Sequence, residues 1–267
     1  MVFYFWSMDN TPIGVFDSGI GGTSIWKELV DLMPLESTVF LADSANAPYG
    51  EKSKEQILEL SIKNTELLVK NGAKLIVVAC NTATTNAIAE LRSTFDVPFI
   101  GIEPAIKPAA LKTKTGVVGV LATKGTLSSS LFHSTTKIHA SGIKVIEQVG
   151  TGLVDLIEGG KLHSSKMKTV LASYIKPMLV QGMDCLVLGC THYPYLIPVL
   201  KELMPPDVTI LDSGLAVAKQ TKTVLAKNNL LAPESATISH YLYSNGDDKL
   251  LKEFVQHSDA EVSFLNF

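Results

Sequence analysis

The sequence lacks the features that would assign it to a nucleic-acid-binding or membrane-embedded class. Its 267 residues carry 23 Lys and Arg against 26 Asp and Glu, a net charge of −3, and the basic residues lie between acidic ones rather than in clusters. No apolar run approaches the roughly 20 residues that a membrane-spanning helix needs, and the apolar cluster at residues 2–6 is too short for a signal peptide. We therefore expect a small-molecule ligand, with neither nucleic acid nor membrane as a partner.

Cysteine is scarce, and the common cofactor motifs are missing. The chain has three Cys, an odd number without a Cys-x-x-Cys pair, which favours free thiols and a cytoplasmic location. No second Cys or His pair accompanies Cys190 and His192, so a metal site is not expected. The turn at residues 19–22 lacks the Lys-Ser/Thr of a phosphate-binding loop, and no lysine marks a pyridoxal Schiff base. The sequence thus predicts a protein without metal or cofactor.

What the sequence does contain is a regular alternation of apolar strands and amphipathic helices. Ser53 and Gln56 form a capping-box pattern before one helix, and Asn71-Gly72 ends it. Strands are predicted in the apolar runs that end at Cys80 and Cys190 and at residues 12–17, 38–42, 97–101, 116–121, 143–149, 208–212 and 238–243. Helices are predicted before Pro34, after Pro194, on both sides of the strand at 238–243, and at residues 82–95, 126–140, 153–158 and 164–181. This order is typical of parallel sheets that helices cover on both faces.

The alternation starts again at Gly116, and in each half a cysteine closes the third strand. We therefore expect an α/β fold of two pseudo-symmetric parallel-sheet domains with the active site between them. The predicted division places residues 12–104 and 214–267 in the first domain and 105–213 in the second, after an N-terminal extension of residues 1–11. Because ligands of such sheets bind beyond the carboxyl ends of the strands, the polar residues that follow each strand are expected at one site.

The chemistry of that site is suggested by two thiols at matching places, Cys80 and Cys190. One thiolate and one thiol on opposite faces of a carbon can remove an α-proton and return another, which inverts the centre. His192 offers Cys190 an adjacent base, and Asp17 either accepts a hydrogen bond from a substrate ammonium or orients the proton of Cys80. Either cysteine alone has about even odds of being structural, since cysteine is among the most buried residue types. Cys185, inside a strand, is assigned to the core.

Five motifs in order resemble the glutamate racemases of the aspartate/glutamate racemase superfamily, and the resemblance runs from about Pro12 to the end of the chain. They are GVFDSGIGG at 14–22, PYG at 48–50, ACNTA at 79–83, GIEPA at 101–105 and GCTHYP at 189–194. The resemblance implies a cofactor-independent isomerase that interconverts L- and D-glutamate and supplies D-glutamate for peptidoglycan. It also implies two pseudo-symmetric domains and, commonly, a homodimer.

Site residues follow from the same resemblance. Cys80 and Cys190 would be the acid/base pair, with Asp17 supporting the first, His192 the second, and Asp43 and Glu158 assisting. The implied substrate contacts are Asp17, Ser18, Tyr49, Gly50, Asn81, Thr82, Thr123, Thr126, Thr191 and His192.

Two alternatives stay open at this point. The same thiols could racemise aspartate or another amino acid, because one methylene changes binding by only about 1–3 kcal/mol. The chain could also be a two-lobed ligand-binding protein without turnover, although both cysteines are present.

Overall fold

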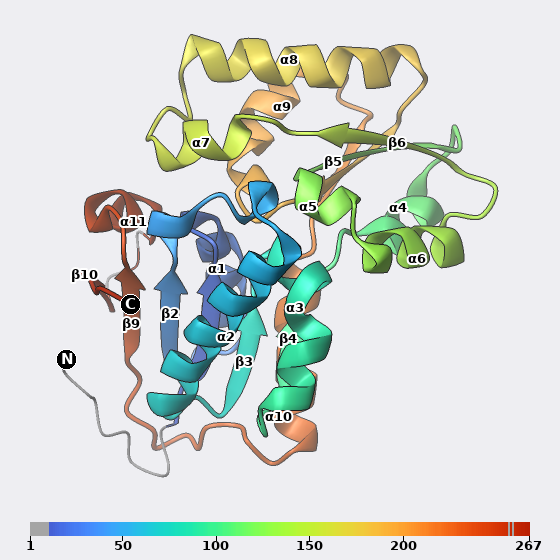
Figure 1. The fold of residues 1–267 in the computed structure, drawn as a ribbon. Helices are drawn as coiled ribbons and strands as arrows, with labels where there is room; N and C mark the ends of the chain where they lie inside the picture. The colour runs from blue at the N-terminus through green and yellow to red at the C-terminus, as the bar shows by residue number, and fades with distance from the viewer. Residues whose placement is uncertain (1–10, 256, 258) are drawn as a thin grey trace.

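The chain forms two α/β units, one above the other in Figure 1, in a computed structural model that describes residues 11–255, 257 and 259–267. The predicted N-terminal extension lies outside the described residues, except for Thr11. We call the six-stranded sheet with its helices the first unit and the four-stranded sheet with its helices the second unit.

The first unit is built from both ends of the described chain. Its strands are β1 (Ile13–Asp17), β2 (Thr38–Ala42), β3 (Leu75–Val78), β4 (Phe99–Gly101), β9 (His240–Ser244) and β10 (Ala260–Phe264), in the order β10-β9-β2-β1-β3-β4. Every neighbouring pair is parallel. Strand β9 pairs with the whole length of β2, so a late segment of the chain contributes to the first sheet.

The second unit repeats the topology of the first. Its parallel strands are β5 (Val117–Ala122), β6 (Lys144–Val149), β7 (Cys185–Gly189) and β8 (Thr209–Leu211), in the order β6-β5-β7-β8. The first four strands of the chain have the corresponding order, β2-β1-β3-β4. The predicted class, two pseudo-symmetric parallel α/β sheets, is therefore confirmed.

Helices bury both faces of each sheet because neighbouring strand residues point to opposite sides. In the first unit Val15 faces α1 (Thr23–Leu32), α10 (Gly214–Lys227) and α11 (Asp248–Val255), whereas Phe16 faces α2 (Lys54–Lys70) and α3 (Asn81–Thr94). In the second unit α4 (Ile106–Lys112), α5 (Lys124–Leu127) and α6 (Ser130–His139) cover one face, and α7 (Leu153–Glu158), α8 (Ser165–Val180) and α9 (Ile197–Leu203) cover the other. One apolar cluster continues from the first unit into the second.

Helix α2 illustrates how local sequence sets an element. The predicted capping box is formed, since Ser53 Oγ accepts from the Gln56 N–H at 3.2 Å and Gln56 Oε1 accepts from the Ser53 N–H at 3.0 Å. At the other end Asn71 is the C-cap residue, and Gly72 follows with φ of +79°. This φ is readily accessible only to glycine, which explains why the helix ends there.

Three predictions about elements need correction. The single helix predicted at 126–140 is wrong: Ser129 Oγ accepts from the Phe132 N–H at 3.2 Å and starts a separate helix, α6, after the short α5. Helix α4 was not predicted, because it is short and contains Pro108 in its first turn. Strand β10 was not predicted either, since it lies at the sheet edge and only half buries its residues.

A buried ion pair lies at the amino-terminal ends of strands β2 and β3 in the first unit. Lys74 Nζ lies 2.6 Å from Glu36 Oε2, with side chains 7% and 4% exposed. The second oxygen of Glu36 accepts from the backbone N–H of Ala232 at 2.8 Å. This carboxylate therefore fixes the segment that leads from α10 to β9.

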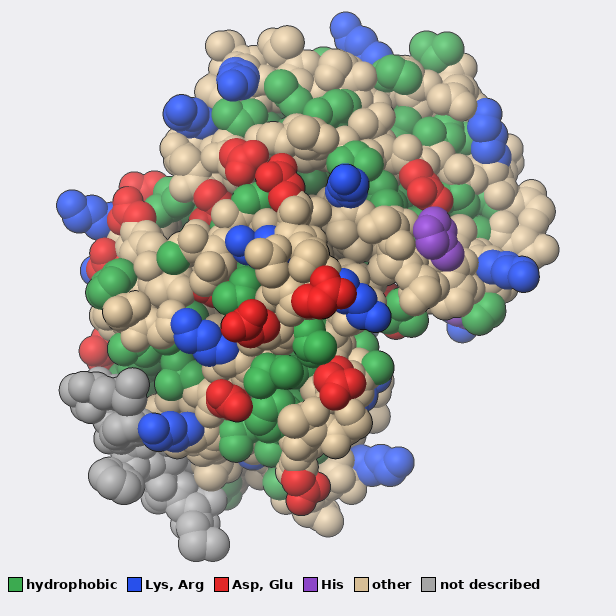
Figure 2. Space-filling view, in the orientation of Figure 1, with side chains coloured by type: hydrophobic (Ala, Val, Ile, Leu, Met, Phe, Trp, Pro, Cys, Tyr) green, Lys and Arg blue, Asp and Glu red, His purple; other side chains and the backbone are tan. Residues whose placement is uncertain are grey.

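No helix within the described ranges has both the length and the apolar character needed to cross a membrane. On the face shown in Figure 2, Lys and Arg side chains are interspersed with Asp and Glu rather than gathered by sign. This face therefore offers no continuous basic track of the kind that binds a nucleic-acid backbone.

Candidate active site

Each sheet has one point at which its strand order reverses. In the first unit the reversal lies between β1 and β3, which lead into Ser18 and Cys80; in the second it lies between β5 and β7, which lead into Thr123 and Cys190. Strands β2, β3 and β9 run toward the second unit in Figure 1, so the carboxyl ends of the first sheet face it. Ligands of parallel α/β sheets bind at such reversal points.

Residues from both units line one small cavity there, which we call the inner cavity. Its lining consists of Ser18, Pro48, Tyr49, Gly50, Cys80, Asn81, Thr82, Thr123, Val154, Cys190, Thr191 and His192. The structure thus brings together most of the predicted site residues, including both cysteines. Asp17, Thr126 and Glu158 do not line the cavity but contact residues that do. Pro48 and Val154 were not predicted as lining residues, and nothing in the sequence marks Val154, an apolar residue of a short helix.

Cys80 lies at the start of α3 with its thiol buried. Its Sγ accepts from the backbone N–H of Ala83 at 3.4 Å and lies 3.6 Å from Ser18 Oγ. Burial, together with the nearby carboxylate of Asp17, raises the pKa of the Cys80 thiol. Before substrate binds, the thiol form of Cys80 is therefore favoured, which suits it to donate a proton.

Cys190 lies in a different environment, at one end of a row of three side chains. Its Sγ is 3.7 Å from His192 Nδ1, and His192 Nε2 is 2.6 Å from Glu158 Oε1. Burial opposes a charge on His192, but hydrogen bonds with Cys190 and Glu158 outweigh it and raise the pKa of the imidazole well above its usual value. Glu158 therefore favours a proton on Nε2 and directs Nδ1 toward the thiol.

Asp17 lies beneath the cavity and joins the two units. It is fully buried and accepts from the Gly22 N–H at 2.7 Å and from Thr191 Oγ1 at 3.3 Å. Burial raises its pKa, although the nearby His192 acts in the opposite direction. Asp17 thus accepts from Gly22 and Thr191, and also from the backbone of Ser18, whereas its effect on Cys80 is electrostatic.

Neutral polar groups surround the two thiols. Thr82 Oγ1 lies 2.7 Å from Thr123 Oγ1 and 3.3 Å from Thr126 Oγ1, so three hydroxyls from the two units meet. The amide of Asn81 is buried, and both its nitrogen and its oxygen lack a partner among the described residues. A buried polar group without a partner is costly, which indicates that a ligand completes its hydrogen bonds.

Tyr49 is held in the cavity wall by a buried carboxylate. Its hydroxyl donates to Asp43 and accepts from Asn64 Nδ2 at 3.1 Å. Asp43 also accepts from the amides of Asn46 at 2.8 Å and Asn245 at 2.5 Å. Burial and the charge of Asp43 raise the pKa of Tyr49, so its hydroxyl stays protonated. Asn245 comes from the segment after β9, and no sequence pattern pointed to it.

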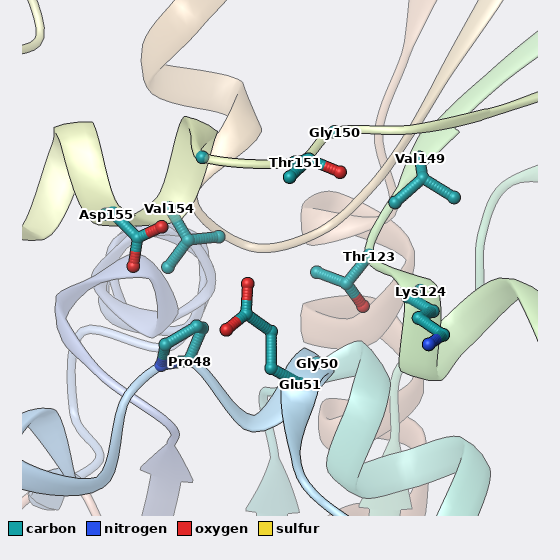
Figure 3. Close-up of a pocket in the computed structure, with 11 residues that line it drawn as sticks. Pro48, Gly50, Glu51, Thr123, Lys124, Val149, Gly150, Thr151, Val154 and Asp155 are labelled. Atoms are coloured by element: carbon teal, nitrogen blue, oxygen red, sulfur yellow. The ribbon is translucent and has the colours of Figure 1, made fainter.

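The inner cavity opens into a larger outer pocket of about 330 Å³ (Figure 3). The two share Pro48, Gly50, Thr123 and Val154 as lining residues. The carboxylate of Glu51 points into the outer pocket between Val154 and Thr123 in Figure 3. The inner cavity itself measures about 10 Å³, close to the space of a single water molecule. An amino acid therefore enters only when the residues around the inner cavity move apart.

Two glycines allow the units to approach this closely. A Cβ on Gly19 would lie 1.9 Å from Glu158 Oε1, and a Cβ on Gly21 would lie 2.3 Å from His192 Nδ1. The predicted tight turn after β1 is confirmed as a short 3-10 helix, Ile20–Gly22. The backbone N–H groups of this turn donate hydrogen bonds to side chains of the protein: Ile20 N donates to Glu158, and Gly22 N donates to Asp17.

Replacing Gly21 with alanine is expected to displace the ring of His192 and to lower kcat about 100-fold, because misplacement by about 1 Å has effects of this size. The measurement is steady-state racemisation of glutamate together with thermal unfolding. Gly142→Ala is the matched control: its φ is +78° with open space around it, so it is expected to cost about 1 kcal/mol of stability without changing kcat. Equal kcat for Gly21→Ala and the unaltered protein would contradict the prediction.

Among the residues that the structure describes, no three or more His, Cys, Asp or Glu side chains form a group that could hold a metal ion. All three cysteines are free and buried, and Cys185 lies in the core as predicted.

One thiol from each unit lines the same cavity, each with its own supporting groups. This is the arrangement needed for proton transfer on both faces of one carbon, the chemistry of amino-acid racemases and epimerases. The chain belongs to the Asp/Glu/Hydantoin racemase family, whose model matches residues 22–221.

Similar proteins narrow this assignment. The chain is 48% identical to a glutamate racemase of Ectopseudomonas mendocina over 242 residues, which cover 90% of this chain and 92% of that protein. It superposes with a TM-score of 0.82 on the glutamate racemase of Escherichia coli in complex with L-glutamate and the activator UDP-MurNAc-ala, at 32% identity over 92% and 94% of the two chains. The glutamate racemase of Francisella tularensis in complex with D-glutamate also gives a TM-score of 0.82, at 28% identity over 96% and 98%.

Proposed function

We propose that this protein is a glutamate racemase that interconverts L- and D-glutamate with Cys80 and Cys190 as its two acid/base groups. The observation that carries the proposal is that these cysteines, one from each unit, line the same inner cavity. The high identity to curated glutamate racemases supports glutamate as the substrate. D-Glutamate made in this way supplies peptidoglycan synthesis, the role that the family resemblance implies.

In each turnover one cysteine begins as a thiolate and the other as a thiol. The thiolate takes the α-proton from one face of glutamate, and the electron pair of the broken C–H bond stays on the α-carbon. The thiol then gives its proton to the opposite face, so the product has the inverted configuration. The protonation states of the two cysteines have exchanged, and the reverse reaction uses them in the opposite roles.

Supporting groups differ on the two sides. On one side His192, oriented by Glu158, takes the proton of Cys190 and stabilises the thiolate as an imidazolium. On the other side burial, together with the nearby Asp17, raises the pKa of Cys80 and favours its thiol form, and Ser18 faces that thiol. Two acid/base groups held in unlike environments are what a two-base reaction requires at its start.

The carbanion is stabilised by neutral donors in a site without bulk water. The unpartnered amide of Asn81 is placed to bind a substrate carboxylate, and the hydroxyls of Thr82, Thr123 and Thr191 offer further donors. Neutral donors delocalise charge onto the carboxylate and do not neutralise the attacking thiolate. The remaining proposed contacts are Asp17, Ser18, Tyr49, Gly50, Thr126 and His192.

Three further assignments belong to this proposal. We take residues 12–104 with 214–267 and residues 105–213 as the two domains, which agrees with the membership of the two sheets. A homodimer is proposed because the resembling family commonly forms dimers, and light scattering of the purified protein tests it. A cytoplasmic location is proposed on the free state of all three cysteines.

The decisive experiment follows L- and D-glutamate in heavy water with the purified protein, without added pyridoxal phosphate or metal. We expect the circular dichroism of either enantiomer to decay to zero while the α-carbon gains deuterium. The assay is repeated with UDP-MurNAc-ala, because the Escherichia coli relative was solved with this activator. Absence of inversion and exchange under both conditions would favour a binding protein, and faster inversion of aspartate would favour the aspartate alternative.

A further inference from the structure

The carboxylate of Glu158 belongs to the second unit but receives two of its hydrogen bonds from the first. The backbone N–H of Ile20 donates to Oε1 at 2.7 Å, and Ser44 Oγ donates to Oε2 at 3.1 Å. Its 2.6 Å contact with His192 lies within the second unit. The position of the carboxylate against the imidazole therefore depends on how the two units meet.

Ser44 lies in a loop whose backbone is held by contacts with the segment after β9. It lies in the loop after β2, in a 3-10 helix at Ser44–Asn46, and the following residue, Ala45, donates its N–H to Asn245 Oδ1 at 2.9 Å. Gly246 packs directly against the Cβ of Ser44. These contacts fix the backbone of the loop that carries Ser44.

The inner cavity is too small for the substrate in the arrangement that has these contacts. It has room for about one water molecule and its lining comes from both units, so residues of the two units must move apart before glutamate fits. Separation withdraws Ile20 and Ser44 from Glu158 and removes Gly21 from the ring of His192, which it touches when closed. Closure on the substrate brings Ile20 and Ser44 back toward Glu158, and Gly21 back toward His192.

We propose that Ser44 is a positioning residue that, together with the Ile20 N–H, fixes Glu158 against His192 only when the two units close, so that the Cys190 side of the site becomes competent for proton transfer on closure. The proposal rests on the proposed racemase function. Ser44 touches neither thiol and does not line the inner cavity; it acts through Glu158. When the units are apart, Glu158 keeps His192 as a partner within the second unit but loses both donors from the first unit.

The test must distinguish proton transfer at Cys190 from proton transfer at Cys80, because the two thiols act on opposite faces of the substrate. The equilibrium constant of a racemisation is one, so kcat/KM is equal in the two directions for any variant and cannot reveal which thiol is impaired. Primary isotope effects with α-deuterated L- and D-glutamate can reveal it. If transfer at Cys190 is slowed, the isotope effect rises for the enantiomer whose proton Cys190 removes, and falls for the other enantiomer, because reprotonation then limits the rate.

For Ser44→Ala we expect kcat/KM to fall about 3- to 10-fold, the effect of losing one typical side-chain hydrogen bond, and the two isotope effects to move in opposite directions. Because Ser44 acts through Glu158, adding Ser44→Ala to Glu158→Gln is expected to have almost no further effect. Ser24→Ala is the matched control, since the Ser24 hydroxyl also crosses between the units, donating to the Thr191 carbonyl at 2.9 Å, but does not touch Glu158.

The outcomes are distinct. The positioning role is supported if the two isotope effects shift in opposite directions in Ser44→Ala but not in Ser24→Ala, and if Ser44→Ala does not lower kcat/KM further when it is added to Glu158→Gln. The role is overturned if the isotope effects of both enantiomers shift in the same direction, or if the losses of kcat/KM caused by Ser44→Ala and Glu158→Gln are fully additive. Failure of the unaltered protein to racemise glutamate contradicts the proposed function instead, and far-UV circular dichroism confirms that each variant has folded.

Discussion

Alanine in place of either Cys80 or Cys190 is expected to lower kcat for racemisation about 10²- to 10⁴-fold, the range by which a positioned acid or base accelerates proton transfer. Each variant loses the group on one face of the α-carbon and keeps the group on the other. Inversion needs both, so the double variant is expected to be hardly slower than either single variant, as is typical of residues that act as a unit.

The variants are also expected to differ from each other. The remaining thiol can still remove an α-proton and return a deuteron to the same face, so each variant exchanges one enantiomer in heavy water without inverting it. Cys80→Ala and Cys190→Ala should therefore exchange opposite enantiomers, as followed by proton NMR. Cys185→Ala, in the core of β7, is the control and should racemise normally. Inversion at an unchanged rate in either active-site variant would exclude the two-thiol mechanism.

The second large effect concerns stability. Neutralising either partner of the Lys74–Glu36 pair, by Lys74→Met or Glu36→Gln, is expected to lower the free energy of unfolding by about 3–5 kcal/mol, because the other charge stays buried without a partner. Urea unfolding, followed by far-UV circular dichroism and Trp fluorescence, measures the change.

The double variant Lys74→Met/Glu36→Gln provides the control. It removes both charges, and the amide oxygen at position 36 can still accept from the Ala232 N–H. It is expected to be more stable than either single variant, since a buried ion pair replaced as a whole costs little. Losses below about 1 kcal/mol in both single variants would show instead that water screens the pair as it does at a surface.

Sequence reasoning predicted the elements that local patterns determine. Apolar, β-branched runs gave the strands of both sheets, and a Ser-x-x-Gln pattern gave the start of α2. It missed β10, whose residues are half exposed at a sheet edge, and it merged α5 and α6, because the Ser129 cap looks like any other polar residue in a helical stretch. Local signals of this kind are weak where tertiary contacts decide the outcome.

For the active site too, some features could be predicted from the sequence and others could not. Cys80 and Cys190 could be placed together because each follows a strand, and parallel strands deliver their carboxyl ends to one edge. The contacts of Glu158 with Ile20 and Ser44 could not be predicted, since they depend on the relative position of two units far apart in sequence. For the same reason the role of Asn245 beneath the loop of Tyr49 has no sequence signature.

The discontinuity of the first unit has a consequence for how the protein is made. Strand β9 is synthesised after the whole second unit, so the edge of β2 stays unpaired while the ribosome translates more than half of the chain. An unpaired edge can pair with strands of other chains, so the nascent chain is open to wrong pairing until β9 is made. Asn245, which anchors Asp43 and through it Tyr49, arrives with the same late segment. The hydrogen bonds that anchor Asp43 are therefore complete only after β9 and Asn245 have been synthesised.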